Sequence, residues 1–205
     1  MAVPAPHRLT LASSSPARRE LLSRLGLPFD VRPAAVDEPT TGFGDPRSFV
    51  QAVSWLKASV VAPKVPEGLV LAADTIAWID GGPILKPADE ADARRILRQL
   101  GGREHELWTG VVVWRRPDDL QVVWQERSRV HMKAMDDAEL ERYLATREWR
   151  NNSGAYAIRE DGDPYLSLVE GSVSNVIGLP LETTEKVLRW FSGGSPSPLG
   201  GEGLG

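Results

Sequence analysis

The residues best suited to chemistry begin near the amino end, in the stretch LASSSPARRELL over residues 11–22. Ser15 and Pro16 are favoured residue types at a helix start, yet Arg18 and Arg19 follow in the first turn, where the helix dipole disfavours cations. In one interpretation, the serine hydroxyls, the backbone N–H groups and the arginines bind a phosphate. In the other, the arginines are solvated and paired with an acid. The stretch lacks the glycines and the Lys-Ser/Thr ending of a Walker P-loop.

A single carboxylate, Asp74, interrupts the apolar run from Leu69 to Ile79. Burying a charge is costly unless the charge is paired or bound to a metal, so Asp74 is a candidate general base or metal ligand. The alternative is that Asp74 marks the end of a strand and caps the segment that follows. Lys86 follows a turn signal, after which the chain can return toward Asp74. Lys86 is therefore a candidate member of the same site, although a lone lysine is usually solvated.

Two adjacent acids, Asp37 and Glu38, follow a predicted strand, and adjacent acids in a loop usually face solvent. They become metal-ligand candidates if Asp74 needs a partner, because Mg²⁺ prefers carboxylate and water oxygens. Lys57 lies in a predicted amphipathic helix, and it too is either a solvated residue or a site residue. The segment over residues 151–181 is rich in glycine, serine and asparagine, and such segments often line sites because small residues let the backbone approach a ligand.

The composition restricts the class of protein. The chain has 205 residues, a formal charge of −4 and an isoelectric point near 5.5, which argues against a general polyanion binder. It has no cysteine, which excludes disulfides and thiolate metal sites, and its three histidines lack metal-ligand spacing. It shows no apolar run of about 20 residues and no apolar signal segment at its amino end. We therefore expect a soluble cytoplasmic protein that binds neither nucleic acid nor membrane.

The elements that must position these residues alternate between strand and helix. The predicted strands cover residues 7–12, 29–33, 69–79, 107–115, 120–132, 154–158 and 165–169. The predicted helices begin at residue 16 and cover 45–61, 89–100, 136–146 and 181–191. This alternation, with one hairpin-like pair, predicts an α/β fold with a mixed sheet. We expect a single domain over residues 1–191 and a disordered tail over residues 192–205, which are rich in glycine, serine and proline.

Taken in order, these blocks resemble the Maf family of nucleoside triphosphate pyrophosphatases. The resemblance extends from about Leu9 to Phe191. It rests on LASSSPARRELL, VDE (36–38), WLKA (55–58), ADTI (73–76), ILKP (84–87), LWTGV (107–111), LERYLATREW (140–149), SGAYAI (153–158) and EGSVSNVIGLPL (170–181). No single block is diagnostic, but their order and spacing together are specific.

The resemblance implies hydrolysis between the α- and β-phosphates of a nucleoside triphosphate, with Mg²⁺ or Mn²⁺ as the cofactor. It also implies an elongated mixed sheet with flanking helices and two lobes around a nucleotide cleft. By the same resemblance, Asp74 is the catalytic base that activates water, and Asp74 and Glu38 are the metal ligands. The implied substrate-binding residues are Ser13, Ser15, Arg18, Lys57, Thr75 and Lys86, the lysines neutralising charge on the phosphates.

Several positions depart from the family pattern. The Ser-Pro-x-Arg-Arg spacing is similar to that of the branch acting on 7-methyl-GTP, but Ala17 stands where that branch has an aromatic residue. Thr75 matches the dTTP/UTP branch, and Ala17, Thr75 and Arg159 are the predicted specificity positions. Asn152 replaces the usual lysine, Leu56 the usual acid and Arg159 the usual glutamine. We hypothesise that Arg159 replaces the lost positive charge.

These departures keep a second function open. The leading hypothesis is a pyrophosphatase acting on dTTP, UTP or modified nucleotides. The alternative is a nucleotide-binding regulator, related to cell division and septum formation, with weak or no turnover. A generic α/β domain is disfavoured by the number of ordered blocks. The expected partners are a nucleoside triphosphate and water, and a homodimer is the common default for soluble proteins.

Overall fold

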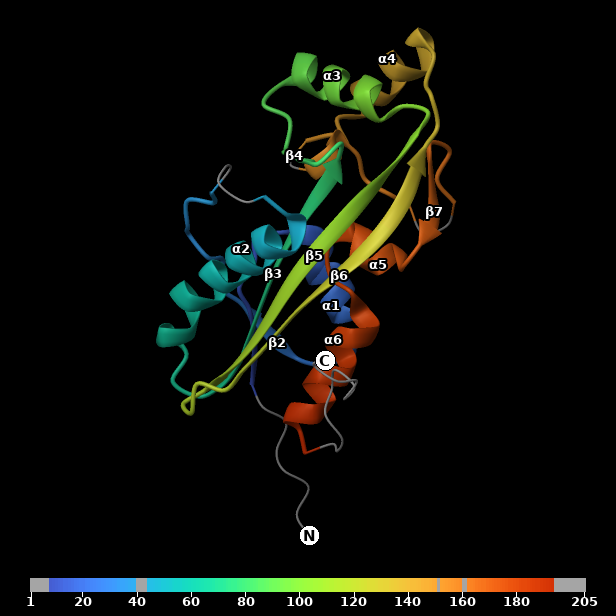
Figure 1. The fold of residues 1–205 in the computed structure, drawn as a ribbon. Helices are drawn as coiled ribbons and strands as arrows, with labels where there is room; N and C mark the ends of the chain where they lie inside the picture. The colour runs from blue at the N-terminus through green and yellow to red at the C-terminus, as the bar shows by residue number, and fades with distance from the viewer. Residues whose placement is uncertain (1–7, 40–43, 151, 160–161, 194–205) are drawn as a thin grey trace, which may run out of the picture.

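The computed structural model describes residues 8–39, 44–150, 152–159 and 162–193 (Figure 1). The strands are β1 (Leu9–Leu11), β2 (Phe29–Val31), β3 (Gly68–Ile79), β4 (Gly82–Ile84), β5 (Arg103–Arg116), β6 (Gln121–Met132) and β7 (Leu166–Glu170). The helices are α1 (Pro16–Ser23), α2 (Pro46–Val61), α3 (Glu90–Leu100), α4 (Asp137–Thr146), α5 (Val173–Ile177) and α6 (Leu181–Phe191). Short 3₁₀ turns, η1 (Ala62–Lys64) and η2 (Ser153–Ala155), complete the set. The predicted tail lies outside the described residues, apart from Ser192 and Gly193.

The described strands form one seven-stranded mixed sheet in the order β2-β1-β3-β5-β6-β7, with β4 bonded to β3. Strand β1 runs parallel to β2 and β3, and the other neighbouring pairs are antiparallel. The central strands β3, β5 and β6 are 12, 14 and 12 residues long, so the sheet is elongated. The predicted α/β fold with an elongated mixed sheet and flanking helices is therefore confirmed.

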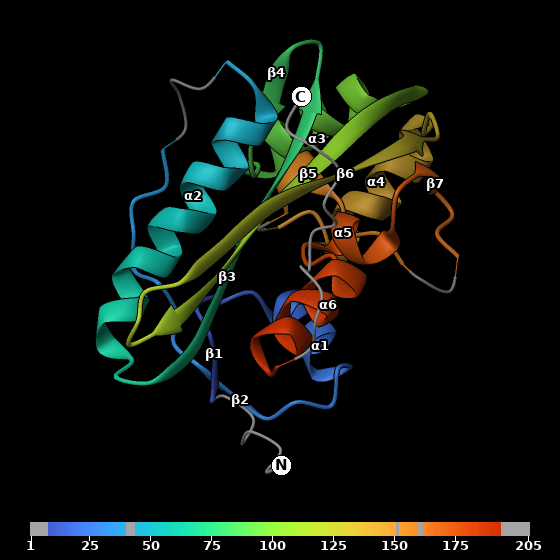
Figure 2. The same ribbon diagram turned by 60° about the horizontal axis from the view of Figure 1, so that its bottom comes forward.

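Helices cover both faces of the long strands (Figures 1 and 2). Helix α2 lies on one face, against even-numbered side chains of β3 such as Val70 and Ile76. On the other face, α1 and α6 pack at one end against Leu71, and α3 and α4 pack at the opposite end against Ala77. Because β3 is buried from both sides, its sequence is apolar almost throughout and does not alternate.

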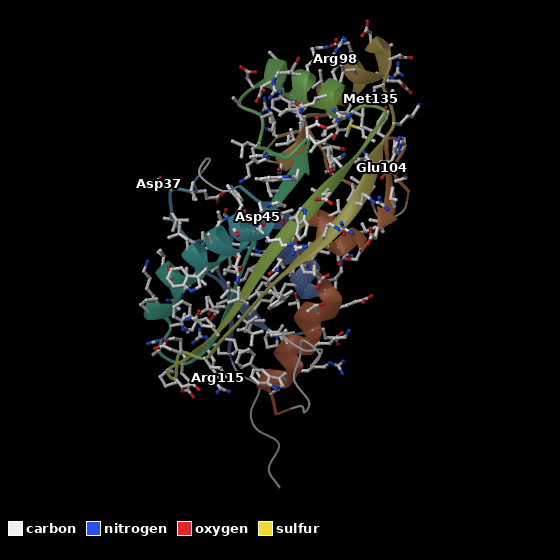
Figure 3. All side chains as sticks on the ribbon, viewed as in Figure 1. Asp37, Asp45, Arg98, Glu104, Arg115 and Met135 are labelled. Carbon is white, nitrogen blue, oxygen red and sulfur yellow. The ribbon has the colours of Figure 1, made fainter. Side chains whose placement is uncertain are left out.

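Local signals set most of the helix starts, as predicted. The side chains of Ser15, Asp45, Asp89 and Asp136 each accept a hydrogen bond from a backbone N–H in the first turn of the helix that follows. Asp45 at the start of α2 is labelled in Figure 3. Such caps satisfy donors that would otherwise lack partners, which is why the helix boundaries can be found from sequence.

The predicted strand over residues 154–158 is wrong. Residues 153–155 form the turn η2, with positive φ angles at positions 154 and 155, and the chain then continues without regular structure. The Ser153 hydroxyl accepts a hydrogen bond from the N–H of Ala77 at 2.8 Å and donates one to the carbonyl of Ile84. This side-chain attachment to β3 and β4 replaces strand pairing. The prediction also missed β4 and α5, which are only 3 and 5 residues long.

No helix in the described part of the chain has the length and apolar character that a membrane crossing requires.

Candidate active site

A cavity of about 480 Å³ lies between α1, the middle of β3 and the segment over residues 152–158. Its walls come from α1, from the middle of β3, from residues 152–158 and from α5. The predicted site residues that line it are Ser15, Ala17, Arg18, Asp74, Thr75 and Lys86. A different and more apolar cavity of about 540 Å³ lies between β1, β2 and α6, and none of the predicted site residues lines it. The chemistry expected from the sequence therefore gathers at the first cavity.

Asp74 lines this cavity and forms a buried ion pair with Lys57, which is not among the lining residues. Asp74 lies in the middle of β3 and Lys57 on α2, and their exposed fractions are 6% and 7%. The Lys57 Nζ donates to Asp74 Oδ1 at 2.6 Å and contacts Glu38 Oε1 at 2.8 Å. Each buried charge is thus compensated by an opposite charge. The alternative that Asp74 ends a strand and caps the next segment is wrong, because the strand continues to Ile79.

Close packing of α2 on the sheet brings Lys57 within reach of Asp74. Gly110 on β5 pairs directly with Asp74 in the register of the sheet. A Cβ atom at position 110 would lie 2.3 Å from the carbonyl oxygen of Val50 on α2, so a larger residue would push the helix away. Gly110 is not among the site residues expected from the sequence. Its signal in the sequence is a lone glycine inside a strand pattern, which indicates a close approach of backbone.

The carboxylate of Glu38 completes this charged group. Burial by itself raises the pKa of Glu38, but its hydrogen bond and ion pair with Lys57, together with the charges of Lys86 and Arg18, lower that pKa below its ordinary value. Glu38 is therefore an anion at neutral pH, and two carboxylates converge on one ammonium nitrogen. The adjacent Asp37 is exposed and lies near the outer edge of the view in Figure 3.

The side chain of Arg18 extends from the first turn of α1 to β3 and to the residue that follows α5. Its Nε donates to the carbonyl of Gly178 at 2.8 Å, and its Nη2 donates to Thr75 Oγ1 at 3.0 Å. Burial lowers the pKa of Arg18, and the charges of Asp74 and Glu38 oppose that change. A guanidinium carries five N–H groups, so these two bonds leave three for an anion in the cavity. Arg18 is thus directed into the cavity.

The serines before α1 are already oriented by backbone donors. Ser15 Oγ accepts from the N–H of Arg18 at 3.3 Å, and Ser13 Oγ accepts from the N–H of Ser15 at 3.2 Å. A hydroxyl that accepts through one lone pair still has its own hydrogen to donate. Ser15 lines the cavity, whereas Ser13 is buried and is not among the lining residues.

Asn152 and Arg159 are the two positions where this sequence changes the charge of the family pattern, and they lie in different places in the structure. Asn152 lines the cavity, and its Nδ2 donates to the carbonyl of Glu148 at 2.8 Å. Arg159 lies outside the cavity lining and forms an ion pair with the Glu148 carboxylate at 2.7 Å, with its side chain 58% exposed. Its placement therefore gives no support to the hypothesis that Arg159 replaces the lost charge. Lys86 is exposed and lines the cavity.

The residues present suit a cation that the substrate helps to bind. Among the described residues, no group of three or more histidine, cysteine or acidic side chains could hold a metal ion alone. Mg²⁺ in phosphate-processing sites is usually held by one or two carboxylates together with substrate phosphates. Asp74 and Glu38, which share the Lys57 nitrogen, match that donor set.

Comparison with known proteins gives the family. The family model described as Maf-like protein matches residues 8–191. A dTTP/UTP pyrophosphatase of Anaeromyxobacter dehalogenans strain 2CP-C is 46% identical over 184 residues, which cover 89% of this chain and 93% of that protein. A dTTP/UTP pyrophosphatase of Pelotomaculum thermopropionicum is 39% identical over 183 residues, which cover 89% of this chain and 96% of that protein.

Among solved structures, the Ham1 protein of Staphylococcus aureus aligns with a TM-score of 0.45 and 16% identity, over 61% of this chain and 71% of that chain. That similarity is too low to support a conclusion about this chain. The family model and the curated relatives cover nearly all of the sequence. They show that this chain belongs to the Maf-like family.

Proposed function

We propose that this chain hydrolyses nucleoside triphosphates to nucleoside monophosphates and pyrophosphate, with dTTP and UTP as preferred substrates. The observation that carries the proposal is Asp74, which lines the same cavity as Arg18 and is paired with the buried Lys57 at 2.6 Å. A carboxylate and several cations at one cavity suit a reaction that needs both a base and an anion site. The preference for dTTP and UTP is supported by the curated relatives, which carry that description.

In this mechanism, Asp74 is the general base. Its Oδ1 is held by Lys57, and the carboxylate accepts a proton from the water that attacks phosphorus at the α–β bridge. The new bond forms between the water oxygen and phosphorus, and the bond to the bridging oxygen breaks. Pyrophosphate then leaves with the negative charge of that oxygen. Lys57 fixes the direction of the carboxylate, so the base needs little reorganisation during the step.

The cations at the cavity bind the polyphosphate. Arg18 offers its remaining N–H groups, the Ser15 hydroxyl donates, and the amino end of α1 contributes its dipole. Lys86, which is exposed and lines the cavity, adds a further positive charge. Phosphoryl transfer depends mainly on positioning and on stabilising charge, which this set of donors can supply.

We propose that Asp74 and Glu38 also hold Mg²⁺ or Mn²⁺ when a triphosphate is bound. A divalent cation supplies charge neutralisation for the phosphate oxygens. In the described structure, Lys57 occupies the position between these two carboxylates, so it shares them with the cation.

The test is release of pyrophosphate from dTTP, UTP, CTP, GTP, ATP and 7-methyl-GTP, measured with Mg²⁺ and with Mn²⁺. The matched control is Asp74→Asn, which keeps the side-chain shape but removes the base. We expect dTTP and UTP to be hydrolysed fastest, and the control to lose about 10²- to 10⁴-fold in kcat, as is typical when a general base is removed. Thermal unfolding of both proteins verifies that the variant is folded.

A different result would favour the second candidate, a nucleotide-binding regulator with little turnover. The observation behind it is that Asn152, at the position of the usual lysine, lines the cavity. If no triphosphate releases pyrophosphate while nucleotides still bind, the pyrophosphatase proposal is wrong.

A further inference from the structure

A chain of hydrogen bonds extends from Arg18 into the interior of the sheet. Arg18 Nη2 donates to Thr75 Oγ1 at 3.0 Å, and Thr75 Oγ1 lies 2.9 Å from Thr109 Oγ1. Thr109 Oγ1 in turn donates to the backbone carbonyl of Asn175 at 3.0 Å. Thr109 and Asn175 are both fully buried. The chain therefore connects the cavity to α5 through the paired positions of β3 and β5.

The direction of every bond in this chain is determined. A backbone carbonyl only accepts, so the single proton of the Thr109 hydroxyl is used on Asn175. Thr109 must then accept from Thr75, and the proton of Thr75 is used on Thr109. Thr75 is left as the acceptor for Arg18, which only donates. Bonds that all point the same way polarise one another and strengthen the whole chain.

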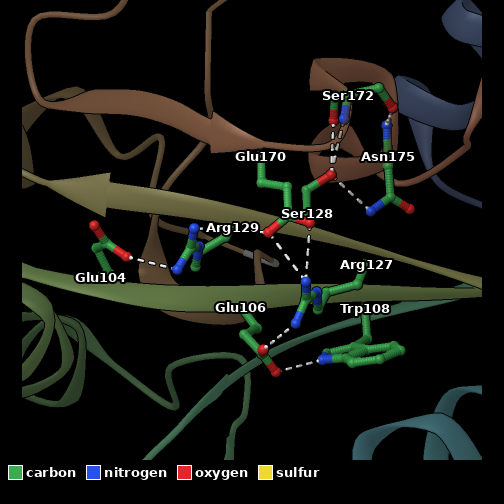
Figure 4. A network of polar contacts seen from close by, with 9 residues as sticks. All are labelled: Glu104, Glu106, Trp108, Arg127, Ser128, Arg129, Glu170, Ser172 and Asn175. Atoms are coloured by element: carbon green, nitrogen blue, oxygen red, sulfur yellow. Dashed lines mark hydrogen bonds and ion pairs between the residues drawn. The ribbon is translucent and has the colours of Figure 1, made fainter.

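The far end of the chain is firmly anchored. Asn175 Nδ2 donates to Ser128 Oγ at 3.0 Å, and Ser128 Oγ donates to the carbonyl of Ser172 at 3.0 Å, as Figure 4 shows. Ser172 also caps α5 by accepting from the N–H of Asn175 at 3.2 Å. These contacts fix α5 on β6. The carbonyl that receives the Thr109 proton therefore has a fixed position.

Helix α5 also positions the second hydrogen-bond acceptor of Arg18, the carbonyl of Gly178. The carbonyl of Gly178, just after α5, accepts from Arg18 Nε at 2.8 Å. Gly178 has a φ of +125°, and a Cβ atom there would lie 3.1 Å from Thr75 Oγ1. Only glycine takes this backbone conformation without strain, and it lets the chain pass closely over the bond between Arg18 and Thr75. Both acceptors of the guanidinium thus depend on α5.

We propose that Thr109 is a positioning residue for Arg18, a role that rests on the proposed function. Thr109 does not line the cavity, so it acts through Thr75. With the Thr109 hydroxyl in place, Thr75 presents a lone pair to Arg18 and the guanidinium is oriented before substrate arrives. Without it, the Thr75 proton has no acceptor, the Thr75 hydroxyl rotates, and Arg18 must be ordered during the reaction.

The test compares two substitutions at one position. Thr109→Val keeps the branched shape and removes the hydroxyl, whereas Thr109→Ser keeps the hydroxyl and removes a methyl group. We expect Thr109→Val to lower kcat/KM about tenfold, the effect of one lost hydrogen bond to a charged system, and Thr109→Ser to stay within about twofold of wild type. A purely structural role predicts that Thr109→Val lowers the thermal unfolding temperature. It predicts no loss of kcat/KM at temperatures where the variant is fully folded.

A double-mutant cycle shows whether the effect passes through Arg18. In an Arg18→Lys background, which retains the charge but cannot hold both acceptors, we expect Thr109→Val to change kcat/KM by less than about twofold. A tenfold loss in that background would overturn the proposal. So would a wild-type kcat/KM in Thr109→Val, or an equal loss in Thr109→Ser.

The cycle remains informative if the proposed function fails. A wild-type protein that hydrolyses no triphosphate contradicts the pyrophosphatase assignment. The same four proteins are then compared by their dissociation constants for inorganic pyrophosphate, measured by calorimetry. Weaker binding in Thr109→Val, rescue in Thr109→Ser and no further loss in the Arg18→Lys background support the positioning role. Equal affinities in wild type and Thr109→Val overturn it.

Discussion

Two walls of the cavity are built in different ways. The wall from α1 and β3 presents charged groups on regular elements, with Asp74 held by Lys57 and Arg18 held by two acceptors. The opposite wall, over residues 152–158, is an irregular segment attached to the sheet through the Ser153 hydroxyl. Groups that perform chemistry need fixed geometry, which strands and helices provide better than loops. Loops, in turn, tolerate sequence change and so suit the part of a site that selects among ligands.

The two walls also differ in the charge of their buried polar groups. At the first wall, the buried side chains of Asp74 and Lys57 carry opposite charges and form an ion pair. Behind the second, the Tyr156 hydroxyl lies 2.6 Å from His105 Nε2. Burial lowers the pKa of His105 to about 4 and raises that of Tyr156, so this pair is neutral at pH 7. The first wall therefore depends on charge pairing, and the second on hydrogen bonding between neutral groups.

The strongest way to disturb the charged wall is to remove one member of its pair. Lys57→Met leaves the buried Asp74 without its partner, and breaking such a pair typically costs about 4 kcal/mol of unfolding free energy. The double variant Lys57→Met/Asp74→Asn removes both charges, and we expect it to be more stable than the single variant. Urea denaturation at pH 7 measures both. Equal stability of the single and double variants would show that charge pairing does not hold this wall together.

The neutral wall should respond to pH instead. Because the folded pKa of His105, about 4, lies below its ordinary value of 6.5, the unfolded chain binds this proton more readily. The stabilising contribution is complete above about pH 6.5 and is lost as the pH falls toward 4, by at most about 3 kcal/mol. We expect His105→Phe to be less sensitive to pH across this window in urea denaturation.

The matched control for this prediction is Tyr156→Phe. It removes the hydroxyl that His105 contacts but leaves the buried imidazole. We expect its stability to fall between pH 6.5 and 4 about as steeply as that of the wild type. Identical slopes for wild type and His105→Phe would mean that His105 is not the titrating group.

The smallest effect is expected at Arg159, which lies on neither wall. Because Arg159 is exposed and pairs with Glu148, we expect Arg159→Ala to keep kcat/KM within about twofold for every triphosphate. The contrasting variant is Asn152→Lys, which adds a cation to a residue that lines the cavity and should lower KM several-fold. A tenfold loss of kcat/KM in Arg159→Ala would instead support the hypothesis that Arg159 replaces the missing charge.

The sequence by itself determined the regular elements and the candidate chemistry. The starts of α1, α2, α3 and α4 follow from caps, which act within four residues, and β3 follows from a long apolar run. Asp74 was identifiable because a carboxylate in such a run must be compensated. Arg18 was identifiable because a cation in the first turn of a helix interacts unfavourably with the helix dipole.

Only the tertiary structure decided which of these residues meet. Lys57 reaches Asp74 because the lone glycine at position 110 lets α2 approach β5, and Arg18 is held by Gly178, 160 positions further along the chain. The segment after residue 152 takes its form from side-chain bonds to β3 and β4, not from its own propensity. Local rules act through neighbours a few residues apart, whereas these contacts depend on how closely separate elements pack.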